Sequence, residues 1–288
     1  MTLATSRPTS TLTLTLTLTR STHVSDAYED ILFEVDPDSR AAIITMNRPE
    51  RYNAFRGQTV DELVDAFRRC WADAAIRSVI LTGAGDKAFS TGGDVKQRAE
   101  TGDYGPTRSG FIDIDYLHRV IREVPKPVIA AVNGYAIGGG QVLHVLCDLS
   151  IASETAIFGQ VGPRVGSFDA GWGTAYLARL VGERKAREIW FLCRQYTAQQ
   201  ALEMGLVNVV VPPERLMDEA RAWAAEIAAL SPTAIKFCKF SFNLDTDHHA
   251  GLEKLAGAGL DLFLHSDEAT EGINAFTAKR PPDYSQFQ

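Results

Sequence analysis

Short runs of apolar, β-branched residues recur along the chain, and stretches of helical spacing separate them. The runs that predict strands are residues 31–35, 41–46, 78–82, 128–132, 149–152 and 207–211. The stretches that predict helices among them are residues 59–71, 116–123, 141–147, 171–180, 184–193 and 198–204. A turn at residues 36–38 joins the first two strands into a pair. Alternating strands and helices predict an α/β fold.

After residue 212 the apolar spacing is helical throughout. The predicted helices are residues 216–230, 233–240, 251–264 and 269–277. We therefore expect three parts: a low-complexity tail at 1–27, an α/β core at 28–212 and a helical region at 213–288.

The first 27 residues differ in composition from the rest of the chain. They are rich in Ser and Thr, alternate Thr with Leu between positions 11 and 19, and contain no acidic residue before Asp26. A transit peptide has this composition, and so has a disordered tail or a reading frame started too early. None of the three is part of the predicted fold.

The charge balance and the cysteines exclude several classes of function. A net charge of -7 argues against nucleic acid as a partner. The four cysteines stand singly, which favours neither a disulfide framework nor a zinc site and fits a reducing cytoplasm. No apolar stretch reaches 18 residues, so we expect no membrane span.

Two glycine-rich loops follow predicted strands, at residues 90–94 (STGGD) and 137–140 (IGGG). Glycine allows the backbone to approach a ligand closely, and a glycine loop that opens a helix directs N–H groups at negative charge. Two such loops can form an oxyanion hole. Neither has the spacing of a dinucleotide or nucleoside triphosphate loop. Tight turns alone are the alternative reading.

Four ordered motifs resemble the crotonase (enoyl-CoA hydratase/isomerase) superfamily from about residue 28 to the C-terminus. They are Arg48-Pro49, Asn53-Ala54-Phe55, residues 88–94 (AFSTGGD) and residues 125–140 (PKPVIAAVNGYAIGGG). The resemblance implies a spiral of stacked ββα units with a helical C-terminal oligomerisation layer, a CoA thioester substrate and a homotrimer or dimer of trimers. It also implies that the amides of Gly93 and Gly139 bind the thioester oxygen.

Two departures argue against a simple hydratase. Hydratases of this family carry one glutamate just after the glycine triplet and one just after a Phe-Gly-Gln motif. Those positions are Val142 and Gly162 here, and neither can exchange a proton.

Residues 158–173, 186–190 and 193–196 resemble a narrower group, 1,4-dihydroxy-2-naphthoyl-CoA synthase and 2-ketocyclohexanecarboxyl-CoA hydrolase. In synthases with glycine at the position of Gly162, a bicarbonate is the base, and its ligands match Gln160 and Trp190. The likeness thus implies no tightly bound cofactor other than this anion. Ser167 and Asp169 match residues that bind a second carbonyl and relay protons, although Ser-Phe-Asp before a helix is by itself typical of an N-cap.

Further residues are expected to bind the substrate. Tyr104 lies where the synthases carry a tyrosine that contacts the substrate. An exposed aromatic residue in a loop, without a role in binding, is the alternative interpretation. Lys96 and Lys279 keep the family spacing of CoA contacts. Arg51 and Arg56 flank the Asn53 motif and are further candidates for the CoA phosphates.

The departure with most consequence is Leu264, because the synthase and the ring-opening hydrolase both have a catalytic tyrosine at that position. His265 beside it is either a substitute for the tyrosine or a surface residue of the helix. Three hypotheses follow. The chain forms or cleaves a carbon–carbon bond next to a thioester; or it is a ring-opening hydrolase, or another hydratase/isomerase-type enzyme; or it binds acyl-CoA without catalysis.

Overall fold

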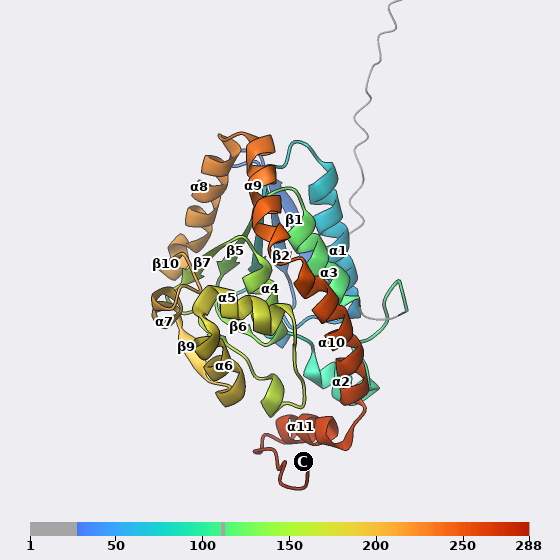
Figure 1. Cartoon of the computed structure of the whole chain (residues 1–288). Helices are drawn as coiled ribbons and strands as arrows, with labels where there is room; N and C mark the ends of the chain where they lie inside the picture. Colours follow the sequence, from blue (N-terminus) through green and yellow to red (C-terminus); the bar gives the residue numbers. More distant parts are fainter. Residues whose placement is uncertain (1–27, 111–112, 288) are drawn as a thin grey trace, which may run out of the picture.

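The computed structural model describes residues 28–110 and 113–287. The low-complexity segment at 1–27 lies outside the described residues. Two β-sheets form the centre, and helices surround them (Figure 1). The predicted α/β class is confirmed. In the described ranges, no helix combines the length and apolar character needed to cross a bilayer.

The larger sheet has six strands in the order β1-β2-β3-β5-β7-β10. β1 and β2 pair antiparallel, as the turn at residues 36–38 predicted, and the other neighbours are parallel. The strands are β1 (Ile31–Asp36), β2 (Ala41–Met46), β3 (Ser78–Gly83), β5 (Val128–Val132), β7 (Leu149–Ser153) and β10 (Val209–Val211).

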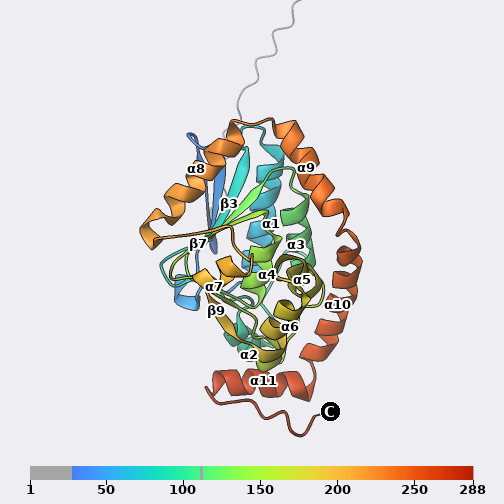
Figure 2. The ribbon, with the colours of Figure 1, turned by 60° about the vertical axis from the view of Figure 1, so that its left-hand side comes forward.

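Both faces of this sheet are covered, which explains its nearly continuous apolar runs. Helix α8 (Leu216–Ala228) covers one face, and α1 (Gly57–Ala72), α3 (Ile114–Glu123) and α4 (Gly139–Leu146) pack on the other (Figure 2). The α8 side holds Ala41, Ile43, Ile80, Ile129, Ala131 and Ile151 of the sheet with Leu216, Ala220 and Ala224 of the helix.

The smaller sheet has four strands in the order β4-β6-β8-β9, and the apolar pattern did not predict it. Its strands are β4 (Ala88–Ser90), β6 (Tyr135–Ile137), β8 (Ile157–Gly159) and β9 (Gln195–Thr197). Each has three residues, too few for an alternation to be recognised. This sheet positions the glycine loops, because β4 leads into Gly92 and Gly93 and β6 leads into Gly138.

The predicted helix at 171–180 is two elements, a π-helical turn at Trp172–Tyr176 followed by α5 (Leu177–Val181). Two glycines at 171 and 173 explain the irregular start, since they weaken regular helix there. A π-helical turn inside a helix is frequent at functional sites. The helices that follow are α6 (Glu183–Leu192) and α7 (Ala198–Glu203).

Three helices end the chain: α9 (Pro232–Leu244), α10 (His248–Leu264) and α11 (Asp267–Thr277). In both ribbon views α10 runs beside α3, and α11 lies below α2 (Val95–Thr101) at the lower end of the molecule (Figures 1 and 2). α9 extends one residue before and four residues after its predicted bounds, whereas α10 begins three residues early and α11 two, and both end as predicted. Helix α8 ends two residues before its predicted end.

Candidate active site

The two glycine loops meet. A Cβ placed on Gly92 would lie 2.7 Å from the amide nitrogen of Gly139. Gly139 is the first residue of α4, so its N–H has no acceptor within the helix. Among the described residues, the amides of Gly93 and Gly139 donate to no protein acceptor. The fold therefore brings two backbone donors together at the start of a helix, where the helix dipole favours negative charge.

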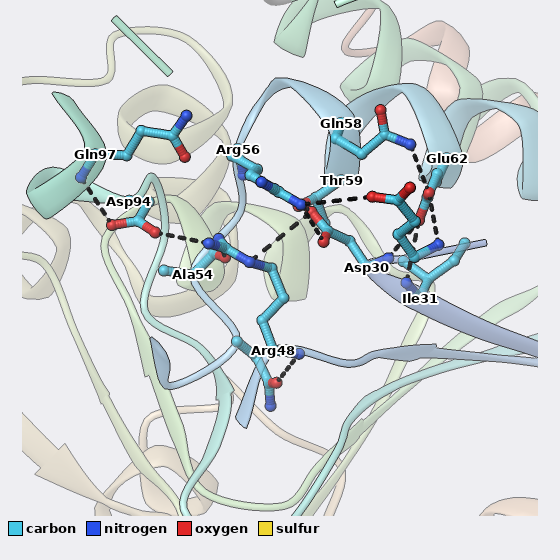
Figure 3. A network of polar contacts seen from close by, with 12 residues as sticks. Asp30, Ile31, Arg48, Ala54, Arg56, Gln58, Thr59, Glu62, Asp94 and Gln97 are labelled. Carbon is cyan, nitrogen blue, oxygen red and sulfur yellow. Dashed lines mark hydrogen bonds and ion pairs between the residues drawn. The ribbon is translucent and has the colours of Figure 1, made fainter. Parts of the chain in front are cut away.

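A partly buried arginine holds the first of these loops in place (Figure 3). Arg48 donates to the carbonyl of Ala54 at 2.5 Å and to the carboxylate of Asp94 at 2.9 Å. The other oxygen of Asp94 accepts from the amide of Gln97 at 3.1 Å and so caps α2. The residue next to Gly93 is thereby fixed from two sides.

Arg56 belongs to the same network rather than to a free basic surface. It donates two hydrogen bonds to Asp30, at 2.8 and 2.9 Å, and Thr59 donates a third at 2.5 Å (Figure 3). Burial opposes the charge of Asp30, but the bonds from Arg56 and Thr59 prevail and lower its pKa. The guanidinium of Arg56 is therefore structural, and of the two arginines that flank the motif only Arg51 stays a candidate for the phosphates.

Tyr104 lies directly against the first donor. A Cβ on Gly93 would be 2.6 Å from Cε1 of Tyr104 and 3.0 Å from its hydroxyl oxygen. The carbonyl of Tyr104 accepts from the amide of Gly57 at 2.7 Å, which anchors the loop to the start of α1. The phenol predicted to contact the substrate thus lies beside the Gly93 amide.

Gly162 has no room for the side chain that a simple hydratase needs. A Cβ there would lie 2.7 Å from the carbonyl oxygen of Ser167 and 3.0 Å from Cζ3 of Trp190. The amide of Ser167 donates to the carbonyl of Gly162 at 2.9 Å, so the loop folds back on itself. At the other glutamate position, Val142 is buried in the apolar core. Neither position offers a carboxylate.

Asp169 is tied to Trp190 through one glycine. The amide of Gly173 donates to Oδ1 of Asp169 at 2.7 Å, and Trp190 Nε1 donates to the carbonyl of Gly173 at 2.5 Å. Burial raises the pKa of Asp169, against opposing contributions from the charge of His118 and the Gly173 amide. A carboxyl with a raised pKa is a better proton donor at a given pH than an ordinary aspartate, because more of it is protonated.

Sequence reasoning missed a buried ion pair near this carboxyl, between Nδ1 of His118 on α3 and the carboxylate of Glu253 on α10. The signal was present in α3, where Leu117, Val120 and Ile121 form the buried face and His118 lies next to them. No pattern in the sequence could pair it with a residue 135 positions away.

The position of the missing tyrosine is the last turn of α10. Leu264 is half-buried there, and His265 is exposed. Nδ1 of His265 lies 2.7 Å from the carbonyl oxygen of Asp261, so the imidazole satisfies the end of its own helix. In the single chain, His265 does not join the residues described above.

The remaining basic candidates lie at or near the surface. Lys96 and Lys279 are exposed, and Arg51 is half-buried. Lys96 belongs to α2, against which α11 packs, and Lys279 follows the end of α11 by two residues. The fold therefore brings the segments that carry the two lysines to the same end of the molecule.

The donors that the narrower likeness assigns to bicarbonate are engaged with backbone carbonyls. Trp190 donates to Gly173 as described, and Nε2 of Gln160 lies 3.3 Å from the carbonyl oxygen of Gly138. The Cβ direction of Gly162 is filled by Ser167 and Trp190. This geometry does not fit a bound anion.

A family model described as enoyl-CoA hydratase/isomerase matches residues 38–287. An enoyl-CoA hydratase/isomerase structure from Pseudoalteromonas atlantica T6c has a TM-score of 0.80 at 28% identity over 88% of this chain and 99% of its own. Carnitinyl-CoA hydratase from Mycobacterium avium has a TM-score of 0.78 at 30% identity over 90% and 100%. An enoyl-CoA hydratase from Mycobacterium avium subsp. paratuberculosis K-10 has 0.78 at 25% identity over 89% and 99%.

Proposed function

Because the chain belongs to the enoyl-CoA hydratase/isomerase family, we propose that its acyl-CoA chemistry proceeds through a thioester enolate bound by the amides of Gly93 and Gly139. The thioester oxygen gains negative charge when a proton leaves the α-carbon. Two preorganised amides stabilise that charge, and one such donor contributes about 3 to 4 kcal/mol. Both amides lie at the junction of the loops, where the described residues offer them no acceptor, and this supports the role.

The finer proposal is a carbon–carbon bond reaction next to the thioester, of the dihydroxynaphthoyl-CoA synthase type. One observation carries it: Asp169 supplies a carboxyl with a raised pKa in the loop of Ser167, whereas Val142 and Gly162 supply none. The simple hydratases of this family carry carboxylates at the latter two positions to add water to an enoyl group. A carboxyl and a hydroxyl on one loop instead suit a second carbonyl group.

In the ring-closing direction, the enolate carbon attacks the carbon of a second carboxyl group in the same acyl chain. The new carbon–carbon bond forms as the hydroxyl of that carboxyl leaves as water after gaining a proton. Asp169 relays the proton that leaves the α-carbon to this hydroxyl, so the carboxyl ends the step in the state in which it began, and Ser167 donates a hydrogen bond to the carboxyl oxygen. In the ring-opening direction, water attacks the ring ketone, the carbon–carbon bond breaks and the α-carbon takes up a proton.

A second candidate is the ring-opening hydrolysis of an alicyclic 2-keto acyl-CoA, or a hydratase/isomerase activity like those named for the similar structures. In this candidate Leu264 reflects a changed substrate, because the synthases and the ring-opening hydrolase both carry a tyrosine at that position. A binding protein without catalysis is the third. Tight acyl-CoA binding with no turnover across a substrate panel would support it.

The deciding experiment offers o-succinylbenzoyl-CoA and 2-ketocyclohexanecarboxyl-CoA to the full chain, with and without bicarbonate, and identifies products by mass spectrometry. Loss of one water from the first establishes ring closure, and gain of one water by the second establishes ring opening. The matched variant is Asp169→Asn, for which we expect activity to fall by about 10²- to 10⁴-fold. Full activity in that variant contradicts the proposed role of Asp169.

We further propose that the chain assembles as a trimer or a pair of trimers. Several large apolar side chains on α9 and α10 are exposed in the single chain, namely Phe237, Phe242, Leu244, Leu255 and Leu262. Exposed apolar surface of this kind marks an interaction site. Sedimentation equilibrium of the full chain tests the assembly, and a monomer at micromolar concentration would contradict it.

A further inference from the structure

The pair of His118 and Glu253 joins two helices that are distant in sequence. In both ribbon views α3 and α10 lie side by side (Figures 1 and 2). The imidazole of His118 on α3 forms an ion pair with the carboxylate of Glu253 on α10. His118 is 3% exposed and Glu253 is 8% exposed. Two ionisable groups have therefore been taken almost completely out of water.

Stability does not account for this pair. Nε2 of His118 and Oε2 of Glu253 are buried and find no hydrogen-bond partner among the described residues. Each such group lowers stability by about 1–3 kcal/mol. Apolar residues of similar volume are often as stable as a buried ion pair or more so. A reason for keeping the charges has to come from their surroundings.

Asp169 is part of those surroundings. Its loop packs against α10, because a Cβ on Gly171 would lie 3.2 Å from both Cα and Cβ of Glu253. The charges of His118 and Asp169 interact, and so do those of Glu253 and Asp169. The fourth ionisable group that acts on the pair is Asp115 of α3, which forms an ion pair with Lys254 of α10 at 3.2 Å.

The directions of the pKa shifts agree with this arrangement. Burial lowers the pKa of His118, but the hydrogen bond and charge of Glu253 prevail and raise it. Burial raises the pKa of Glu253, although His118 opposes the shift. Glu253 thus favours the protonated imidazole, and the positive charge of that imidazole draws the pKa of Asp169 down against the effect of burial.

We propose that His118 and Glu253 are positioning residues that set the protonation of Asp169, with Glu253 holding the proton on the imidazole and the imidazolium tuning the carboxyl. This role rests on the proposed function, in which Asp169 gives and takes a proton. Neither residue needs to touch the substrate.

The test measures the pH profile of kcat in His118→Gln, Glu253→Gln and the double variant, on the CoA thioester that the wild type turns over. His118→Gln removes the imidazolium, so the pH limb governed by Asp169 moves up by about one unit. Glu253→Gln removes the partner that favours the imidazolium but also a negative charge that repels Asp169, so the limb moves up by less. The double variant keeps an amide–amide hydrogen bond and shifts no further than His118→Gln. Glu123→Gln on the exposed side of α3, where Glu123 pairs with Arg119, is the control and leaves the limb in place.

A merely structural pair gives another result. His118→Gln would then lower the melting temperature or kcat without moving the limb, and that outcome overturns the inference. The shift in the pKa of Asp169 can also be measured without substrate. The melting temperatures of wild type and Asp169→Asn are compared across pH, first with His118 present and then in the background of His118→Gln. Full activity in Asp169→Asn would remove the proposed function, whereas an inactive Asp169→Asn with an unmoved limb in His118→Gln removes only this inference.

Discussion

The indole N–H of Trp190 donates a 2.5 Å hydrogen bond to the carbonyl oxygen of Gly173. The amide N–H of the same glycine donates to the carboxylate of Asp169. The two peptide groups that flank Gly173 therefore link the indole to the carboxyl. The role of Trp190 in this geometry is to fix the loop that carries Asp169, rather than to offer its N–H to an anion.

Trp190→Phe should therefore weaken both stability and turnover. The buried carbonyl of Gly173 would lose its donor, which lowers the free energy of unfolding by about 1–3 kcal/mol. The loop with Asp169 would also lose its support, and kcat should fall. The matched control is Trp223→Phe on α8, where the indole donates to Glu219 at 2.8 Å far from the site. Equal kcat in the two variants would contradict the loop-fixing role.

Gly93→Ala should abolish most turnover without unfolding the chain. The new methyl group would press on the ring of Tyr104 and displace the Gly93 amide. Loss of one oxyanion donor lowers kcat by about 10²- to 10³-fold. Gly251→Ala on α10 is the control, because no atom lies within 4 Å of its Cβ position. Steady-state kinetics with circular dichroism distinguish the two, and an active Gly93→Ala enzyme would exclude that amide as a donor.

The sequence predicted the larger sheet well, because β2, β3 and β5 are long enough to show apolar runs. It could not predict the smaller sheet, whose strands of three residues are indistinguishable from loops. The two glycine loops could be located from the sequence because glycine has a specific backbone use, and their role as an oxyanion hole stays a prediction. The pair of His118 and Glu253 was not, since its meaning depends on two helices packing together.

Lys96 and Lys279 should contribute to binding of the CoA phosphates and not to the chemical step. We expect Lys96→Gln and Lys279→Gln each to raise KM for the CoA thioester several-fold, with kcat nearly unchanged, and to weaken the dependence of KM on salt. A truncated thioester of the same acyl group on N-acetylcysteamine lacks the phosphates and serves as the control substrate. If KM rises equally for both substrates, the lysines do not contact the phosphates.

The carboxyl of Asp169 should lower the free energy of unfolding at neutral pH, and replacing it with a neutral amide should raise that free energy. Burial raises the pKa of Asp169 above the value of an unfolded aspartate, about 3.9. The folded state therefore binds this proton more tightly, so the stability of wild type declines, relative to a neutral variant, as the pH rises from about 4 through the folded pKa. Asp169→Asn keeps an oxygen for the Gly173 amide and carries no charge.

The melting temperature of Asp169→Asn should therefore exceed that of wild type by more at about pH 7.5 than at about pH 4. The corresponding gain in the free energy of unfolding is about 1.4 kcal/mol for each pH unit that separates the folded and unfolded pKa values of Asp169. Asp218→Asn, at an exposed position on α8, removes a carboxylate without burial and controls for net charge. A difference that is the same at both pH values would show that the carboxyl of Asp169 titrates alike in the folded and unfolded chain.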